Sequence, residues 1–480
     1  MNMPTLAKRT FAVGLAFACG TALAEAAKLA GTTGGSAIDG RLHARPFGVC
    51  REAGGRRERV HRQRRRGRGV GVPRRLCEAA DDRSPVTDSC GKAFVCGIIP
   101  NMKARSYSAL VAGLLLASPL VAAEKSPEAQ SLLARLKETE SSGRILSGCA
   151  AQVDWNTNEA AWVYRHTGKW PVVNTFDFGH DVYSAKGGWI DYSDPGPALG
   201  WAKAGGIVSI IWHAVQRTND GKGWTFYAGK EPGQTDFRPE CIFDPGSTEG
   251  SNYIARLDQV ARWLVPLRDA GVPVLWRPYH EAQGNWRDEF PGVDWHHAWF
   301  WWGSSGPETL KRLWRQMYDK FTNEYGLTNL VWVWTGSDME GDSLKWYPGD
   351  GYVDVVAFDA YHLDADGVKK VADMLAAKYP GKVKVLAECG DVPTPGEYLD
   401  KGARFALFST WYDPCRTVDP ASEVYASGAH EHFPATKWKA AFADPRVLSR
   451  ETHFPTPLFQ TPPLLKSGVK SKAETWPGSL

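Results

Sequence analysis

The chain has 480 residues, of which 43% are hydrophobic and 23% are charged, and its formal net charge is +4. This composition is typical of a globular protein and excludes a wholly disordered or fibrous chain. The charge is unevenly distributed: residues 1–125 hold 21 basic against 9 acidic side chains and no tryptophan, whereas residues 126–480 hold 36 against 44 and all 21 tryptophans.

Two segments near the start of the chain have the pattern of an export signal. The first has basic residues before an apolar run at 11–19, and the second has the same arrangement around a run at 109–121 that is followed by small residues. A basic start, a short apolar core and small residues are typical of a secretory signal. Neither run reaches the roughly 20 residues of a membrane-spanning helix. We therefore expect a secreted or periplasmic protein with no stable membrane span.

An arginine-rich stretch lies between the two signals, with eleven arginines in residues 51–75. It could be a basic arm that binds nucleic acid or an anionic surface, or it could be disordered or non-native sequence. We favour the second interpretation, because a second export signal follows the stretch and its cleavage would remove it. Our hypothesis is that translation starts at Met102, that residues 1–101 are a mis-assigned or disordered extension, and that residues 102–123 are the signal peptide. We expect no nucleic-acid partner.

From residue 144 onward, apolar runs of strand length alternate with segments that have helical or loop patterns. Eight runs span residues 144–150, 171–176, 206–212, 272–277, 329–334, 353–358, 383–387 and 403–408. Helical candidates between them include 251–270 and 306–325, the second with Pro307 and Glu308 in its first turn. Strands that are apolar on both faces and separated by crossovers predict a parallel sheet.

Eight strand–helix units predict an α/β fold, namely a (β/α)8 TIM barrel that forms a single catalytic domain over residues 126–452. A Pro-rich C-terminal tail follows at 453–480. The alternative is an open doubly wound sheet. Such a sheet ordinarily carries a Gly-rich phosphate-binding turn after its first strand, and the residues at 147–151 lack that pattern.

Polar and aromatic residues follow the apolar runs, at positions that would face one shared cleft at the carboxyl ends of the barrel strands. They are Asp177, His213, His280, Glu281, Trp334, Asp359, Tyr361, His362, Glu388, Trp411 and Tyr412. Indole faces stack on the apolar faces of sugar rings, and carboxylates can cleave the bonds between them. The inventory therefore favours hydrolysis of a neutral polysaccharide. We find no Cys-x-x-Cys or His-x-x-x-His spacing in residues 126–480, so we expect no metal and no other cofactor.

Two glutamates stand out in this set, because each follows or ends an apolar run: Glu281 after the fourth run and Glu388 after the seventh. Cleavage of a glycosidic bond needs one carboxylic acid to protonate the leaving oxygen and a second carboxylate opposite the anomeric carbon. Either glutamate alone could be a solvated loop residue or an ion-pair partner. As a pair at corresponding strand ends, they predict a catalytic couple.

Three segments closely resemble the glycoside hydrolase family 26 mannanases. They are Pro-Tyr-His-Glu-Ala-Gln-Gly-Asn-Trp from Pro278, Ala-Trp-Phe-Trp-Trp-Gly from Ala298, and Ala-Glu-Cys-Gly from Ala387. The resemblance extends over residues 131–446. It implies an eight-stranded barrel and a retaining, double-displacement enzyme that cleaves internal β-1,4-mannosidic bonds in mannan, glucomannan or galactomannan.

The resemblance also implies roles for single residues. By position, Glu281 matches the acid/base of the family and Glu388 matches its nucleophile. His280 matches a histidine that helps to set the hydrogen bonding of the nucleophile, and Tyr361 matches the tyrosine beside it. His213 matches a sugar-site histidine. A further match is Trp411, which corresponds to an aromatic platform at the bound sugar.

One departure from the family pattern concerns the indole of the catalytic site. The family commonly continues from Gly-x-Trp directly into Phe-Trp-Trp-Gly, but here residues 287–298 intervene between Trp286 and Trp299. Either tryptophan could be the catalytic-site indole, and we favour Trp299. We interpret the neighbouring Trp301 and Trp302 as packing residues. We expect Asp359 to anchor His280.

Two rival functions remain open at this point. The same chemistry could act on another β-glycan, such as xylan or a mixed-linkage glucan, because related barrels reuse one site for different sugars. Alternatively, the chain could be a non-catalytic carbohydrate-binding protein that keeps the aromatic platforms. We expect a polysaccharide as the partner and a monomeric protein.

Overall fold

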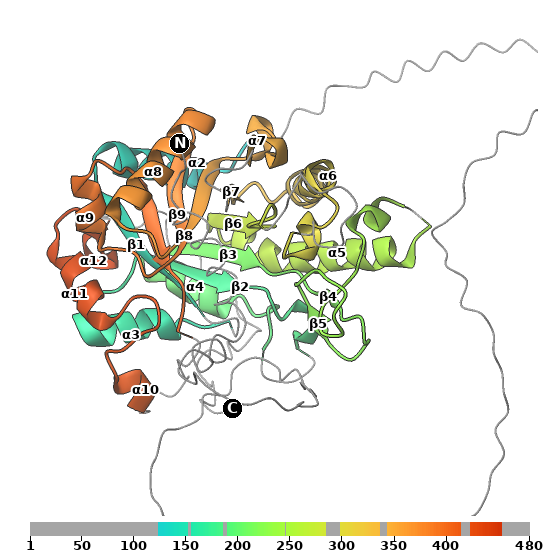
Figure 1. The fold of residues 1–480 in the computed structure, drawn as a ribbon, viewed down its shortest axis with the longest axis horizontal. Coiled ribbons are helices and arrows are strands. Elements are labelled where there is room, and N and C mark those ends of the chain that lie inside the picture. The colour runs from blue at the N-terminus through green and yellow to red at the C-terminus, as the bar shows by residue number, and fades with distance from the viewer. Residues whose placement is uncertain are drawn as a thin grey trace, which may run out of the picture. The chain divides into compact units, whose positions relative to one another are not determined.

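In the part of the chain that the structure describes, eight parallel strands close into a barrel (Figure 1). The structure is a computed structural model, and it describes residues 123–151, 155–185, 190–244, 246–284, 298–336, 343–413 and 423–453. The barrel strands are β1 (Ile145–Ala150), β2 (Val173–Asp177), β3 (Ile207–Trp212), β6 (Val274–Pro278), β7 (Leu330–Gly336), β8 (Val355–Tyr361), β9 (Val383–Gly390) and β10 (Leu407–Thr410). Each strand pairs with the next in this order and β10 pairs with β1, so the predicted (β/α)8 barrel is confirmed.

The strands are buried on both faces, as their continuous apolar runs predict. Successive side chains of a strand point to opposite faces, and in β9 this places Val383, Val385 and Ala387 in the cluster inside the barrel. Leu386 belongs to the larger cluster between the barrel and its helices, and so does Cys389, because the strand register shifts between Leu386 and Glu388. Two separate hydrophobic cores therefore support the barrel wall.

Helix α2 (Pro127–Ser141) closes one end of the barrel. Its buried Ala129, Leu132 and Leu136 belong to the interior cluster, together with residues of the strands. Lys125, just before the helix, donates to the carbonyl of Leu330 at the start of β7. Burial of each leucine contributes about 1.5–3 kcal/mol. The carboxyl ends of the strands lie at the other end of the barrel.

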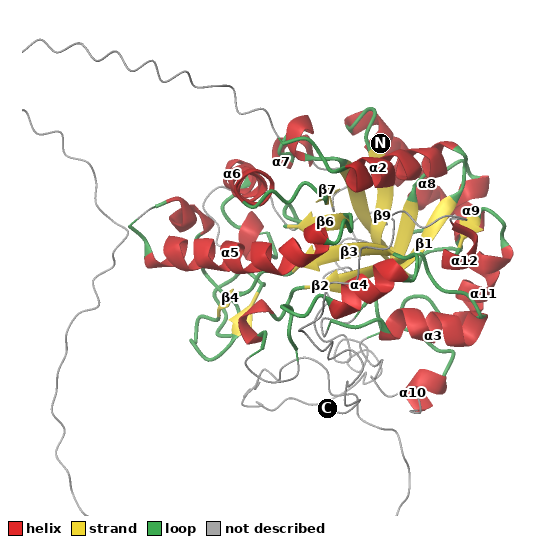
Figure 2. Cartoon of the chain, turned by 180° about the vertical axis from the view of Figure 1, so that it is seen from behind, coloured by secondary structure: helices red, strands yellow, loops and turns green. Residues whose placement is uncertain are grey.

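The remaining helices lie around the outside of the strands (Figures 1 and 2). They are α3 (Asn158–Thr167), α4 (Gly196–Lys203), α5 (Thr248–Asp269), α6 (Pro307–Tyr318), α7 (Ser343–Trp346), α8 (Ala365–Lys378), α9 (Pro395–Asp400), α10 (Glu423–Ala426), α11 (Ala435–Ala443) and α12 (Arg450–His453). The helices predicted at 251–270 and 306–325 are present, but the second changes into a π-helix at Asp319–Glu324. None of the helices in the described ranges is both long and apolar enough to cross a membrane.

Other boundaries differ from the sequence-based expectation. The eighth strand begins at Leu407 and not at residue 403, because the N–H of Ala403 still bonds to the carbonyl of Tyr398 in the turn after α9. The hairpin of β4 (Gln216–Arg217) and β5 (Trp224–Thr225) and the short β11 (Val447–Leu448) beside β1 were not expected. Strands of two residues are too short to leave a periodic pattern in a sequence.

Candidate active site

Most of the predicted site residues come from the carboxyl ends of barrel strands. Asp177 ends β2, Trp334 lies within β7, Asp359 and Tyr361 lie within β8, and Glu388 lies within β9. His213 and Trp411 directly follow β3 and β10, and His280 and Glu281 follow β6 after one intervening residue, Tyr279. Of the predicted site residues, Trp286 lies outside the described residues.

Arg277, on β6, is the centre of the hydrogen-bond network. Its NH1 group donates to Glu388 Oε2 at 3.0 Å, its Nε group donates to Thr335 Oγ1 at 2.9 Å, and its NH2 group forms an ion pair with Asp359. The arginine is 2% exposed. A buried guanidinium thus bridges two buried carboxylates and fixes their positions. We expected Asp359 to anchor His280, but its hydrogen-bonded oxygen faces Arg277 instead.

Glu388 has a hydrogen-bond donor on each carboxylate oxygen. Tyr361 donates to Oε1 at 2.7 Å, and Arg277 donates to Oε2. Burial raises the pKa of Tyr361 well above its usual value, and the negative charge of Glu388 adds to the rise, so the phenol remains a donor. Both oxygens of the carboxylate are therefore tied to fixed donors. The arrangement suits a nucleophile held in one orientation.

Glu281 has a different environment, although it lies in the same site. Burial raises the pKa of Glu281 to about 7, and the negative charge of Glu388 adds to the rise. The Glu281 backbone is left-handed, with φ of 51°, and so is that of Tyr279, at 48°. Such strain persists only where the surrounding structure imposes it, and it is common at functional sites. Glu281 can therefore carry a proton near neutral pH while Glu388 accepts hydrogen bonds.

Two histidines stand next to this pair of glutamates. Asp177 Oδ2 lies 2.6 Å from His213 Nδ1, and Asp177 Oδ1 accepts the backbone N–H of His213. The rings of His213 and His280 are 4.5 Å apart at nearly right angles. Burial lowers the pKa of His280 well below its usual value, and the charge of Arg277 adds to this effect. His280 is therefore a neutral group at physiological pH.

The aromatic residues divide into those that contact the site and those that support it. Trp411 lies 6.1 Å from His213, ring to ring, and Trp299 packs over Gly284, where a Cβ atom would come within 2.2 Å of the indole. Both indoles are partly exposed. By contrast, Trp301 and Trp302 are fully buried and donate to the carbonyls of Ala214 and His280. The packing interpretation of this last pair is confirmed.

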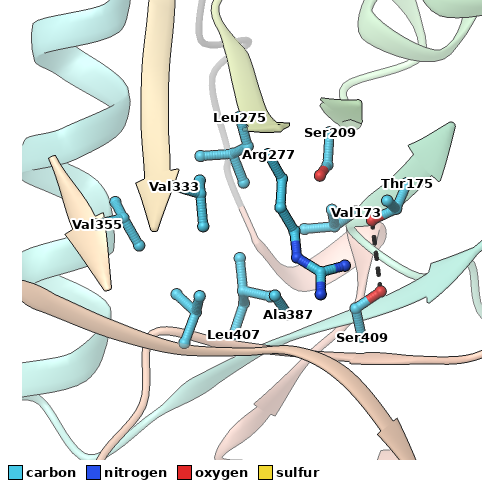
Figure 3. A pocket seen from close by; sticks show the side chains of 11 residues that line it. Val173, Thr175, Ser209, Leu275, Arg277, Val333, Val355, Ala387, Leu407 and Ser409 are labelled. Atoms are coloured by element: carbon cyan, nitrogen blue, oxygen red, sulfur yellow. Dashed lines mark hydrogen bonds between the residues drawn. The ribbon is translucent and has the colours of Figure 1, made fainter. Parts of the chain in front are cut away.

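A small cavity lies inside the barrel, against the side chain of Arg277 (Figure 3). Most of its lining is aliphatic, and the hydroxyls of Thr175 and Ser409 lie 3.5 Å apart in its wall. Figure 3 shows the guanidinium on the side of these two hydroxyls, with Leu275 and Val333 on the opposite side of the arginine. The cavity is enclosed by strand side chains, so we interpret it as the floor of the site and not as a cleft for a polymer.

One group in the described ranges has the spacing of metal ligands. His280, Glu281 and Asp359 each offer an atom, and these three atoms lie within 4.8 Å of one another. The guanidinium of Arg277 already pairs with Asp359 and would repel a cation there. The geometry therefore fits acid/base chemistry better than metal binding.

Comparisons with known proteins agree with this geometry. The sequence profile described as glycosyl hydrolase family 26 matches residues 121–433. The chain belongs to glycosyl hydrolase family 26. A curated relative, a mannan endo-1,4-beta-mannosidase of Thermothelomyces thermophilus, is 32% identical over 260 residues, which are 53% of this chain and 50% of that protein. The chain spans about half the length of the first curated relatives that it matches.

Solved structures of similar proteins have the same fold. The GH26 domain of an endo-beta-mannanase/endo-beta-glucanase from Prevotella bryantii is 33% identical, with a TM-score of 0.59, over 68% of this chain and 97% of that one. A beta-mannanase from a symbiotic protist of the termite Reticulitermes speratus, solved with a gluco-manno-oligosaccharide, is 27% identical. Its TM-score is 0.57, and the match covers 69% of this chain and 96% of that one.

Two residues of this site were given no role from the sequence. For Arg277 a functional and a structural role were equally open, and Thr335 was not singled out. A charged residue within an otherwise apolar strand is a signal that could have found the arginine, because buried arginines are rare unless paired. The threonine leaves no such signal, since threonine is common in strands.

Proposed function

We propose that this family 26 chain is an endo-acting hydrolase that cleaves β-1,4-mannosidic bonds in mannan, glucomannan or galactomannan. The observation that carries the proposal is the contrast between Glu388, whose two oxygens both accept hydrogen bonds, and Glu281, whose pKa is raised to about 7. Two carboxyls with separated protonation states are what glycoside hydrolysis needs. The similarity to known mannanases supports mannan as the substrate class.

In the first step of the proposed mechanism, protonated Glu281 transfers its proton to the glycosidic oxygen as that oxygen leaves. Ionised Glu388 attacks the anomeric carbon at the same time and forms a covalent glycosyl ester. Arg277 and Tyr361 keep the attacking carboxylate in place through their two hydrogen bonds. The leaving chain departs with a new hydroxyl group.

In the second step, a water molecule replaces the leaving chain. Glu281, now ionised, takes a proton from this water as the water attacks the anomeric carbon and releases Glu388. Two inversions at one carbon give net retention of configuration. The positive charge of Arg277 supports the returning carboxylate of Glu388.

The neighbouring side chains would hold the sugar. We assign hydroxyl contacts to His213 and His280, whose rings adjoin the glutamates, and stacking to Trp411 and Trp299, whose indoles are partly exposed. Asp177 orients His213 through its 2.6 Å contact with Nδ1. Trp286 remains an alternative to Trp299 for the stacking role and lies outside the described residues.

A substrate panel tests this proposal. The chain should release reducing ends from galactomannan and glucomannan much faster than from xylan or a mixed-linkage glucan. Glu388→Gln should lower turnover by at least about a thousandfold, because the variant lacks the nucleophile. Glu140→Gln is a matched control, since Glu140 pairs with Lys384 at the start of β9, far along the strand from Glu388. Preference for xylan would assign another β-glycan, and binding of mannan without turnover would show a carbohydrate-binding protein.

We also propose that the enzyme is exported as a monomer by the signal at 102–123. Sequencing the N-terminus of the mature protein tests the export signal, and we expect a start close to Glu124. A mature start near Glu25 would contradict this proposal. Size-exclusion chromatography with light scattering should give the mass of a single chain.

A further inference from the structure

The segment between α10 and α11 places a buried histidine against the active site. His432 is 4% exposed, and its ring meets the ring of Tyr361 edge to face, with centroids 5.7 Å apart. Tyr361 donates the 2.7 Å hydrogen bond to Glu388 Oε1. The mechanism described above gives His432 no part, although this histidine lies directly behind one of the two donors to the proposed nucleophile.

The backbone of this segment is held in place from both sides. His430 Nδ1 accepts the backbone N–H groups of His432 and Phe433, at 2.9 and 3.0 Å. The other ring nitrogen of His430, Nε2, lies 3.0 Å from Glu159 Oε1 of α3. On the other side, the carbonyl of His432 accepts the N–H of Asp391, just after β9. The backbone position of His432 is therefore set by α3, through His430, and by the end of β9, the strand that carries Glu388.

The rings of His432 and Tyr361 both pack against Gly390 of β9. A Cβ atom at Gly390 would lie 2.6 Å from His432 Nδ1 and 2.7 Å from Tyr361 Cε1, so only glycine fits there. Gly390 ends β9, two residues after Glu388. The tyrosine ring thus has little room to move away from the histidine.

The contact between these rings is one of packing and not of charge. Burial lowers the pKa of His432 to about 4, with a further contribution from His430, although Asp391, Glu388 and Asp413 face the ring and act in the opposite direction. The ring is therefore neutral near pH 7. Its Nδ1 atom is buried and has no hydrogen-bond partner among the described residues. The His432 ring can therefore pack against the Tyr361 phenol and leave its hydroxyl free to donate to Glu388.

We propose that His432 is a positioning residue, whose ring holds the Tyr361 phenol in hydrogen-bond contact with Glu388. The inference rests on the proposed role of Glu388 as nucleophile. Loss of the histidine ring would let the phenol turn and would weaken one of the two hydrogen bonds to the carboxylate. The effect should therefore appear in the step that forms the glycosyl ester and should depend on the tyrosine hydroxyl.

A double-mutant cycle tests this dependence. We would measure kcat/KM on a soluble mannooligosaccharide for the unaltered enzyme, His432→Ala, Tyr361→Phe and the double variant. Tyr361→Phe should lower kcat/KM by about ten- to a hundredfold, as expected for a hydrogen bond to a charged group, and His432→Ala by about tenfold. When Tyr361 is already replaced by Phe, His432→Ala should lower kcat/KM by less than about twofold, because the hydroxyl that the histidine ring positions is already absent. The inference would be overturned if His432→Ala lowered kcat/KM by about tenfold both in the unaltered enzyme and in the Tyr361→Phe variant.

Two further variants separate positioning from folding. His432→Phe keeps an aromatic edge and should retain at least about half of kcat/KM even if His432→Ala fails to fold; a large loss in a folded His432→Phe variant would overturn the inference. The matched control is His453→Ala, which removes another buried histidine, on α12 outside the site, and should leave kcat/KM within about twofold. An unaltered enzyme without activity on mannan would instead refute the proposed function.

Discussion

Arg277 is the residue on which the geometry of the site depends most. It joins Asp359, 82 positions away in the chain, to Glu388, 111 positions away. Removal of one partner from a buried ion pair is strongly destabilising, at about 3–5 kcal/mol, because the other charge is left uncompensated. The arginine therefore supports both the fold of this region and the orientation of Glu388, the proposed nucleophile.

Replacement of Arg277 by lysine should be costly, although the charge is kept. A lysine ammonium lacks the planar fork that reaches two carboxylates and Thr335 at once. We expect Arg277→Lys to lower kcat/KM by at least about a hundredfold and to lower the melting temperature. Steady-state kinetics and thermal denaturation check both effects, and activity within a few-fold of the unaltered enzyme would contradict the bridging role.

Glu281 should set the alkaline limit of activity. The general acid must be protonated when the leaving oxygen departs, and the pKa of Glu281 is raised to about 7. The folded enzyme thus holds the catalytic proton below about pH 7 and loses it as the pH rises further. We expect kcat/KM to fall along a basic limb with an apparent pKa near 7. A basic limb whose apparent pKa lies below about 5.5 or above about 9, in an enzyme that is still folded, would argue against Glu281 as the general acid.

The roles of single residues were predictable only in part. Glu281 and Glu388 could be found because a pair of carboxyl groups at strand ends is rare by chance, and the structure puts both next to Arg277. The bond from Asp359 to Arg277 could not be predicted, because sequence spacing does not show which buried charges meet. His432 left no signal, since it lies in a segment without a periodic pattern.

At the scale of elements, the eight strands were predictable because burial on both faces leaves a continuous apolar run. The prediction of where helices begin and end depended on capping residues. Ser247 precedes α5, and its hydroxyl accepts the N–H of Gly250 at 2.8 Å while donating to the carbonyl of Cys241. The π-helical end of α6 was not predictable, because its pattern of apolar residues continues beyond Tyr318 without a break.

The N-cap of α5 should contribute measurably to stability. Ser247→Ala removes the acceptor for one helical N–H and should lower the free energy of unfolding by about 1 kcal/mol. Ser251→Ala is the matched control, since this exposed serine lies one turn into the same helix, and the change should be within about 0.5 kcal/mol. Urea denaturation checks both variants. Equal losses would show that the cap adds nothing specific.

At the scale of the whole molecule, the barrel closes within the described part of the chain. Strand β10 pairs with β1, α2 covers one end, and β11 and α12 complete the packing around residue 453. We therefore propose that the catalytic domain needs neither the extension at 1–123 nor the tail at 454–480. The alternation of strands and helices was enough to predict this closed architecture from the sequence.

A chain of residues 124–453 tests this domain boundary. It should unfold cooperatively and should keep kcat/KM on mannooligosaccharides within about twofold of the full chain, because the proposed site and both hydrophobic cores lie inside it. Circular dichroism and steady-state kinetics are sufficient measurements. Loss of cooperative unfolding would place part of the domain in the removed segments.

Glu388 is the proposed nucleophile of a retaining mannanase. The sharpest test of this role is to trap the covalent intermediate with a 2-deoxy-2-fluoro-β-mannoside that carries a good leaving group, and then to identify the labelled peptide by mass spectrometry. We predict time-dependent inactivation, with one fluoromannosyl group attached to Glu388. A label on another residue, or inversion of configuration in the product of the active enzyme, would contradict the account.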